Sequence, residues 1–197
     1  EKVAIDGITL HVKEGDFVTV IGSNGAGKTT FLNLIAGTFT TDEGEIFIGR
    51  ASVTRLPEHR RAKYLGRIFE NPVMGTASTM PIEENLAMAD LRGKPRGLRW
   101  GVTKSRRSFY KETLKGLDLG LEERLKDSVS LLSGGQRQSL TLLMATLSLP
   151  KLLLLDEHTA ALDPKTAQRV IELTEKIVRE NHLTTIMVTH NMQQAIR

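Results

Sequence analysis

A glycine-rich turn near the start of the chain carries residue types that bind phosphate. Residues 22–29 read Gly-Ser-Asn-Gly-Ala-Gly-Lys-Thr and fit the pattern G-x-x-x-x-G-K-[ST] in full. The turn lies between a β-rich run that ends at Ile21 and a helical pattern that begins near Lys28, so backbone N–H groups and a helix N-terminus can face an anion. Lys28 is placed to reach the β- and γ-phosphates of a nucleotide, and the Thr29 hydroxyl to take a Mg²⁺ position. The predicted nucleotide-binding residues are Gly22, Ser23, Asn24, Gly25, Ala26, Gly27, Lys28, Thr29 and Thr30.

Two acidic residues follow a leucine run much later in the chain. Residues 152–155 are all leucine, as in a central parallel strand, and Asp156 and Glu157 come directly after them. Ligands bind outside the carboxyl ends of parallel strands, so both acids should lie beside the phosphate loop. We predict that Asp156 holds Mg²⁺, directly or through water, and that Glu157 polarises a water for attack on the γ-phosphate. The alternative, two plain strand-end charges, is disfavoured because a buried strand rarely ends in two acids without partners.

The elements that must position these residues alternate between strand and helix. β-rich runs occur at 8–12, 17–21, 44–49, 65–69, 151–156 and 184–189, and helical patterns at 28–36, 57–64, 82–91, 108–117, 136–147, 164–180 and 191–197. This alternation predicts an α/β fold with a parallel sheet. The segment from about 72 to 147 is mostly helical, and we interpret it as a subdomain inserted in a core of about 1–71 and 148–197. We therefore expect one domain over 1–197.

The composition limits the classes of protein to consider. With 197 residues, 40% hydrophobic and 25% charged, the chain suits one large globular domain. It has no cysteine, which excludes disulfides and thiolate metal sites. No apolar run approaches the ~20 residues that span a bilayer. The first residue is not Met and the last residues continue a helical pattern, so we expect both termini to be truncated or disordered.

A second helix N-terminus with anion-binding character is predicted between the phosphate loop and the acids. Residues 132–136 read Leu-Ser-Gly-Gly-Gln. Ser133, Gly134 and Gly135 would present a hydroxyl and backbone N–H groups at the start of the helix from Gln136. One chain would then have two phosphate-binding ends.

Together these segments resemble the ATP-binding cassette (ABC) family. Residues 132–136 match its signature motif, LSGGQ; residues 159–163, Thr-Ala-Ala-Leu-Asp, resemble its D-loop, and Thr189-His190 resembles its switch histidine. The resemblance covers nearly the whole chain, with the motifs in the right order. It implies a P-loop NTPase core with a mostly parallel sheet, an N-terminal antiparallel β portion and an inserted helical subdomain.

The resemblance also implies how the site works, with ATP and Mg²⁺ as cofactors. Two cassettes would pack head to tail with two ATP at the interface, and the signature of one would close over the γ-phosphate held by the other. The signature residues are Ser133, Gly134, Gly135 and Gln136. Asp163 would lie at this interface and also cap the next helix. His190 would contact the γ-phosphate and help hold the attacking water, which makes Lys28, Glu157 and His190 the expected catalytic residues.

Two positions depart from the family pattern. Glu70 stands where the family usually has Gln; a carboxylate keeps an oxygen ligand for Mg²⁺ and adds a negative charge. The expected metal ligands are therefore Thr29, Glu70 and Asp156. His158 stands where the family usually has Pro, so we expect modest loosening of the strand exit without a chemical role. The family's adenine-stacking aromatic has no counterpart before Ile8, so adenine specificity rests on the resemblance alone.

The resemblance implies the ATPase subunit of a transporter at the cytoplasmic face of the cell membrane. Separate transmembrane permease subunits would dock on the helical region and on the loop after Glu70. Residues 75–85 are most similar to cassettes of bacterial importers for small solutes such as amino acids, so a solute-binding protein and a second copy of the chain are the other expected partners.

Two further classes of function stay open. A soluble ABC ATPase of repair would separate the phosphate loop from the signature by a long coiled coil, and one of translation would carry two cassettes; neither pattern is present. A regulatory ATP-binding module with weak hydrolysis is disfavoured by Glu157 and His190, although Glu70 keeps it open.

A basic run separates two of the expected helices. Residues 92–107 carry seven Lys or Arg, three Gly and no acid. A solvated surface loop is the first interpretation, anionic lipid headgroups the second and nucleic acid the third. With a net charge of only +4 and few aromatic residues nearby, we expect no nucleic-acid partner.

Overall fold

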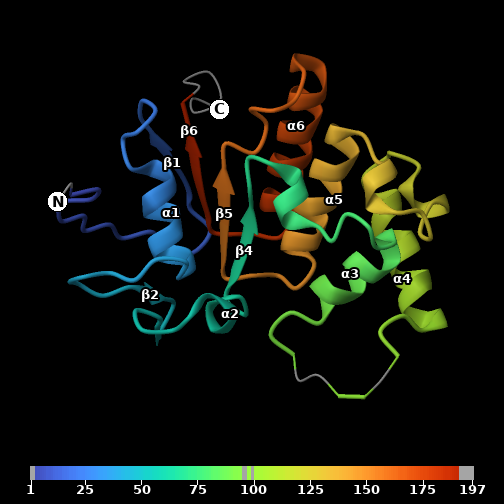
Figure 1. Ribbon diagram of the computed structural model, residues 1–197, viewed down its shortest axis with the longest axis horizontal. Coiled ribbons are helices and arrows are strands. Elements are labelled where there is room, and N and C mark those ends of the chain that lie inside the picture. Colours follow the sequence, from blue (N-terminus) through green and yellow to red (C-terminus); the bar gives the residue numbers. More distant parts are fainter. Residues whose placement is uncertain (1–2, 95–96, 99, 191–197) are drawn as a thin grey trace.

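A four-stranded parallel sheet forms the centre of the computed structural model, which describes residues 3–94, 97–98 and 100–190 (Figure 1). Its strands, in spatial order, are β1 (Phe17–Ile21), β6 (Thr185–Thr189), β5 (Leu152–Asp156) and β4 (Leu65–Ile68). In register, Ile21 pairs with Thr189 and Asp156 with Val188. The segments that follow all four strands therefore leave the sheet at one edge, which gathers residues that are far apart in sequence.

Helices cover both faces of this sheet. On one face, α1 (Lys28–Ala36) buries Leu32 and Ile35 against residues of β4, β5 and β6. On the other face, α5 (Gly134–Thr146) and α6 (Pro164–Glu180) pack Leu142, Ala145 and Val178 against the opposite side of the strands. Because β5 is covered on both faces, all five of its residues are buried, which explains its unbroken leucine run.

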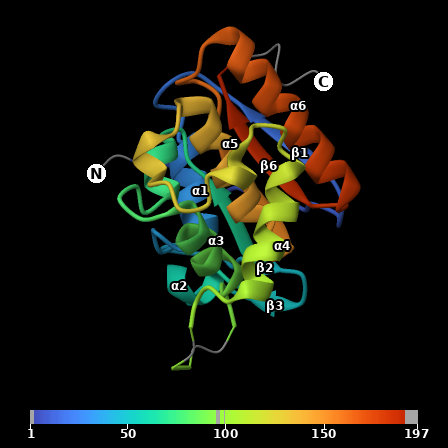
Figure 2. The same ribbon diagram turned by 90° about the vertical axis from the view of Figure 1, so that its right-hand side faces the viewer.

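Figure 2 views the molecule from the side of the helical region, which has a hydrophobic core of its own. It contains α3 (Ile82–Asp90), α4 (Lys104–Lys115) and 3₁₀ turns at Pro72–Gly75, Leu121–Glu123 and Val129–Leu131. Leu140 and Met144 of α5 complete this core, while Leu142 faces the sheet. The division of the chain at about 72 and 147 stays a proposal, in which α5 belongs to both parts.

Two expected strands differ from the structure. Residues 8–12 form no strand: Ile8 and Leu10 are exposed, and no strand of the described residues pairs with them, so alternation alone does not make a ladder. Within 44–49 only β2 (Phe47–Ile48) is extended, and it pairs antiparallel with β3 (Ala51–Ser52). The short helix expected at 57–64 is α2 (Glu58–Arg61), and the helix expected at 191–197 lies outside the described residues.

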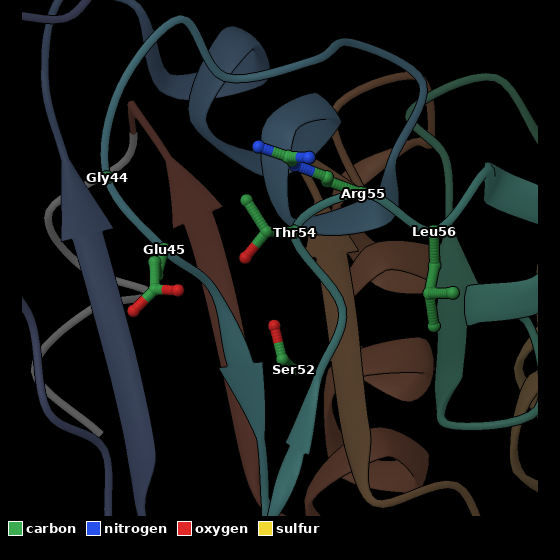
Figure 3. A pocket seen from close by; sticks show the side chains of 6 residues that line it. All are labelled: Gly44, Glu45, Ser52, Thr54, Arg55 and Leu56. Atoms are coloured by element: carbon green, nitrogen blue, oxygen red, sulfur yellow. The ribbon is translucent and has the colours of Figure 1, made fainter.

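The β2–β3 hairpin borders a shallow hollow of about 260 Å³ (Figure 3). Glu45 comes from the segment before β2, whereas Thr54 and Arg55 come from the segment after β3. The full lining is Gly44, Glu45, Ser52, Thr54, Arg55 and Leu56. None of these belongs to the predicted nucleotide site, so we assign this hollow no role.

Candidate active site

The phosphate loop connects β1 to α1 through glycines that no other residue could replace without strain. Gly25 and Gly27 have φ angles of 80° and 86°, and a Cβ atom on Gly27 would stand 2.8 Å from the carbonyl oxygen of Ala4. Lys28 is buried at the first turn of α1, and its Nζ donates hydrogen bonds to the carbonyl oxygens of Gly22 (2.8 Å) and Ser23 (3.1 Å). The ammonium thus lies inside the curve of the loop, where phosphate oxygens could replace these carbonyls.

Asp156 ends β5 beside the first turn of α1. Thr29 Oγ1 donates to Asp156 Oδ1 at 3.3 Å, and Arg67 Nη2 of β4 lies 3.6 Å from Asp156 Oδ2. Burial raises the pKa of the Asp156 carboxyl, and the positive charge of Arg67 opposes that effect. A hydroxyl and a buried carboxylate at this spacing suit Mg²⁺, which takes a few protein oxygens and relies on phosphates and water for the rest.

Glu157 lies between two nitrogen groups from two other elements. Its Oε1 is 3.4 Å from Lys28 Nζ, and its Oε2 is 2.7 Å from His190 Nδ1. His190 directly follows β6, and the backbone N–H of Glu157 donates to Val188 O of that strand at 3.1 Å. Glu157 has φ of 42°, a left-handed conformation that is uncommon for a residue other than glycine. The parallel sheet thus brings together Lys28, Glu157 and His190.

The signature segment forms the N-terminus of α5. Ser133 is the N-cap: its Oγ accepts from the Gln136 backbone N–H at 3.2 Å, while Gln136 Oε1 accepts from the Ser133 backbone N–H at 3.1 Å. A Cβ atom on Gly135 would stand only 2.2 Å from Thr166 Cγ2 at the start of α6. Among the described residues, no hydrogen bond or ion pair joins residues 133–136 to the phosphate loop.

Asp163 caps α6, as the sequence predicts. Its Oδ1 accepts from the Thr166 backbone N–H at 3.1 Å, and hydrogen bonding from the side chain of Thr166 and then from its backbone lowers the pKa of the Asp163 carboxyl. Thr166 therefore joins the Asp163 cap to the signature glycine. No local pattern in the sequence predicts this contact, because it depends on how α5 and α6 approach each other.

Glu70 lies apart from Thr29 and Asp156 in its contacts. It is exposed, two residues beyond the end of β4, and it forms no hydrogen bond or ion pair with the other described residues. The preceding Phe69 carbonyl accepts from Gln138 Nε2 of α5 at 3.4 Å. The loop of Glu70 is thus attached to the helical region, and a role for Glu70 at the metal stays a proposal.

His158, the residue directly after Glu157, is packed in the interior of the protein. Its ring is buried, and Nε2 lies 3.3 Å from Thr174 Oγ1 of α6. Burial lowers the pKa of His158 to about 4, so the ring is neutral at pH 7. The side chain ties the segment after Glu157 to α6, a contact that the expectation of a looser strand exit did not include.

Arg67 is the residue of this region that sequence reasoning missed. A signal was available, since Arg67 is the one charge within the run Leu65 to Phe69, and a buried strand holds a charge only with partners.

The chain is similar in sequence to a known protein family and to known proteins. The profile of the family described as "ABC transporter" matches residues 5–160. The chain belongs to the ABC transporter family. The "Tyrosine transport ATP-binding protein" of Clostridioides difficile is 45% identical over 192 residues, which cover 98% of this chain and 76% of that relative.

More distant relatives and solved structures also belong to ABC transporters or their cassettes. The "Methionine import ATP-binding protein MetN" of Streptococcus pneumoniae is 34% identical over 96% of this chain, and the chain spans about half of its length (53%). A solved dimeric ABC cassette bound to ADP and Pi in a post-hydrolysis state has a TM-score of 0.80 at 31% identity, covering 98% of this chain and 82% of that one. A second dimeric structure of that same cassette, described as a bacterial ABC transporter cassette, gives a TM-score of 0.80 at 30% identity, with the same coverage.

The comparisons confirm the predicted family, the P-loop NTPase α/β fold class and the activity of an ATP-binding, ATP-hydrolysing cassette that powers transport. No helix of the described residues is both long and apolar enough to cross a membrane. The solved cassette that shares this fold is described as a dimer.

Proposed function

We propose that this cassette hydrolyses ATP at the edge of the sheet where Lys28, Asp156, Glu157 and His190 meet, and thereby drives import of a small solute. The observation that carries the proposal is the position of Glu157, with Lys28 Nζ at 3.4 Å and His190 Nδ1 at 2.7 Å from its two oxygens. A carboxylate with these neighbours can orient a water and accept its proton beside a bound γ-phosphate.

Each residue at this edge has a distinct task in the proposal. Lys28 would turn from the loop carbonyls to the β- and γ-phosphates, which adds positive charge where the transition state is negative. Glu157 would act as general base, and His190 would hold both Glu157 and the attacking water. Thr29 and Asp156 would hold Mg²⁺, and the site would then supply a divalent charge to the phosphate oxygens.

The signature would act on the ATP of a second copy of the chain. The N-terminus of α5 presents the Gly134 and Gly135 backbone beside the Ser133 cap, which is an anion-binding arrangement. Among the described residues it makes no bond to its own phosphate loop, which supports a head-to-tail dimer with two ATP. Asp163, at the exposed start of α6, would lie in that interface.

The permease subunits would dock on the 3₁₀ turn after Glu70 and on α3. Val73, Met74 and Met88 are exposed there, and Met74 is 67% exposed. Exposed apolar side chains on neighbouring elements suit a protein interface. The names of the relatives refer to transport of tyrosine and import of methionine, so we propose an amino acid as the solute, a solute-binding protein as a further partner and the cytoplasmic face of the membrane as the location.

Copurification tests the transport assignment. The wild-type cassette, expressed in its own host and captured in detergent, should retain a polytopic membrane protein that mass spectrometry identifies as an ABC permease. Met74→Glu should abolish this capture, whereas Phe47→Glu, at an exposed phenylalanine on the β2–β3 hairpin, should leave it intact. If both variants retain the permease, or if both lose it, the result would count against this docking surface. An active wild-type ATPase that captures no permease would favour a soluble ABC ATPase.

A further inference from the structure

A partly buried arginine lies within the central sheet beside the acid of the proposed metal site. Arg67 is the third residue of β4, and its side chain is only 12% exposed. Placing a charge in a strand of this kind is costly unless the charge is paired and hydrogen-bonded. The contacts of Arg67 therefore indicate what the charge is for.

Uncharged groups fix the position of this guanidinium. Nη2 donates to Asn33 Oδ1 at 2.7 Å, and Nη1 donates to Thr38 Oγ1 at 3.4 Å, so α1 and the segment after it hold the guanidinium. Phe69, directly after β4, also contacts the guanidinium: Arg67 Cζ lies 4.6 Å from the centre of the Phe69 ring. The planar guanidinium is thus held in one place.

The charged group that Arg67 meets in this position is Asp156. Arg67 Nη2 lies 3.6 Å from Asp156 Oδ2, while Asp156 Oδ1 accepts from Thr29 Oγ1 at 3.3 Å. The two carboxylate oxygens therefore have different partners, a fixed cation on one side and the proposed metal-binding hydroxyl on the other. A divalent cation at the Thr29 side would share its carboxylate with Arg67.

We propose that Arg67 is the built-in counter-ion of Asp156, which orients this acid before metal arrives and lowers the affinity of the site for Mg²⁺. The inference rests on the proposed function, in which Thr29 and Asp156 hold the metal. The fixed positive charge of Arg67 and a divalent cation on the same carboxylate repel each other. The charge of Arg67 therefore lowers the affinity for Mg²⁺, and bound Mg²⁺ in turn weakens the ion pair between Arg67 and Asp156. Removing the charge should leave Asp156 less compensated without metal and make metal binding stronger.

The test compares the Kd of a fluorescent ATP analogue, mant-ATP, in EDTA and in Mg²⁺. The Kd in EDTA divided by the Kd in Mg²⁺ is a ratio that measures how much the metal strengthens nucleotide binding. Arg67→Gln should raise this ratio about tenfold, since charge repulsion across this spacing is of that order. Arg67→Lys keeps the charge and should stay within about threefold of wild type. Arg67→Met is a second uncharged variant in case the Gln variant does not fold.

Arg92 offers a matched control. It is also a partly buried arginine beside β4, but it donates to the carbonyl oxygens of Leu65, Ala145 and Met144. Arg92→Met should lower the Tm equally with and without Mg²⁺ and nucleotide. Arg67→Gln should lower the Tm of the free protein more than that of the loaded protein, because the metal replaces the lost charge.

The outcomes separate the inference from the proposed function. If Mg²⁺ strengthens nucleotide binding to wild type and Arg67→Gln leaves the ratio unchanged or lowers it, the inference is overturned and the metal site stands. In an Asp156→Asn background, Arg67→Gln should no longer change the ratio; an equal rise there would show that the charge does not act through Asp156. A wild-type protein whose affinity for mant-ATP ignores Mg²⁺ would overturn both.

Discussion

His190 Nδ1 lies 2.7 Å from Glu157 Oε2, which joins the end of β6 to the end of β5 at the edge of the sheet that faces the phosphate loop. The other Glu157 oxygen is 3.4 Å from Lys28 Nζ. Lys28 and His190, which lie more than a hundred positions apart in the sequence, thus share the carboxylate of Glu157. Because each oxygen of Glu157 has a partner within the protein itself, the carboxylate is oriented before any nucleotide is present.

The His190–Glu157 bond predicts a specific effect on turnover. His190→Ala should lower the steady-state rate of ATP hydrolysis about 100-fold, because general-base catalysis loses the group that orients the base and its water. The affinity for mant-ATP should change little, since Lys28 and the loop backbone would still hold the phosphates. Loss of binding together with turnover would place His190 in nucleotide binding instead.

The contact between Gly135 and Thr166 predicts a compensating pair. Gly135→Ala should lower the free energy of unfolding by about 1–3 kcal/mol, because its Cβ would stand 2.2 Å from Thr166 Cγ2. Thr166→Ser removes that methyl group, so the double variant should recover most of the loss in urea unfolding. Gly134→Ala is the control, since its Cβ would meet Leu162 Cδ2 at 3.3 Å. Equal losses in the single and double variants would mean that Thr166 is not the obstacle.

The burial of His158 predicts a pH dependence of stability. The folded-state pKa is about 4, below the ordinary value of 6.5, so the unfolded chain takes up a proton first as the pH falls. The neutral ring contributes its full stability above pH 6.5, and this contribution is lost as the pH falls toward 4. At pH 5 the free energy of unfolding should already be lower by about 2 kcal/mol than at pH 7 because of this residue. His158→Gln should remove this part of the slope when unfolding in urea is measured from pH 7 to 5. Parallel curves for the two proteins would contradict the assignment.

Glu70 allows a test of its proposed role at the metal. Glu70→Gln should keep ATPase activity and make it less dependent on Mg²⁺ concentration, because a negative charge near the phosphates is removed. Glu70→Ala removes the oxygen ligand and should impair Mg²⁺-dependent turnover. Titrating ATPase activity with Mg²⁺ measures both effects, and Glu58→Gln, an exposed acid on α2, serves as control. Full activity of the alanine variant would show that Glu70 is a bystander, as its lack of partners among the described residues allows.

The sequence was sufficient to predict the bounds of a helix where residues at its two ends begin and terminate it. The bounds of α1 and α6 match the sequence prediction because Gly37 ends α1 with φ of 84°, and Asp163 and Pro164 begin α6. The strand expected at 8–12 failed for the opposite reason, since a strand needs a partner that its own residues do not reveal.

The same distinction applies to the candidate site. Glu157 and His190 could be placed at one edge of the sheet because each directly follows a parallel strand, and Lys28 follows the loop after β1. The orientation of Glu157, the charge of Arg67 against Asp156 and the packing of His158 on Thr174 depend on contacts between distant segments. No local pattern encodes such contacts, so they required the structure.

The central claim, that Glu157 activates the water that cleaves ATP, is tested most directly by Glu157→Gln. The amide keeps the size and position of the side chain but cannot accept the proton. We predict that steady-state hydrolysis falls by at least about 100-fold, while mant-ATP binds as to wild type and ATP produces a stable dimer by size-exclusion chromatography. Hydrolysis near the wild-type rate in a variant that binds ATP would contradict the account.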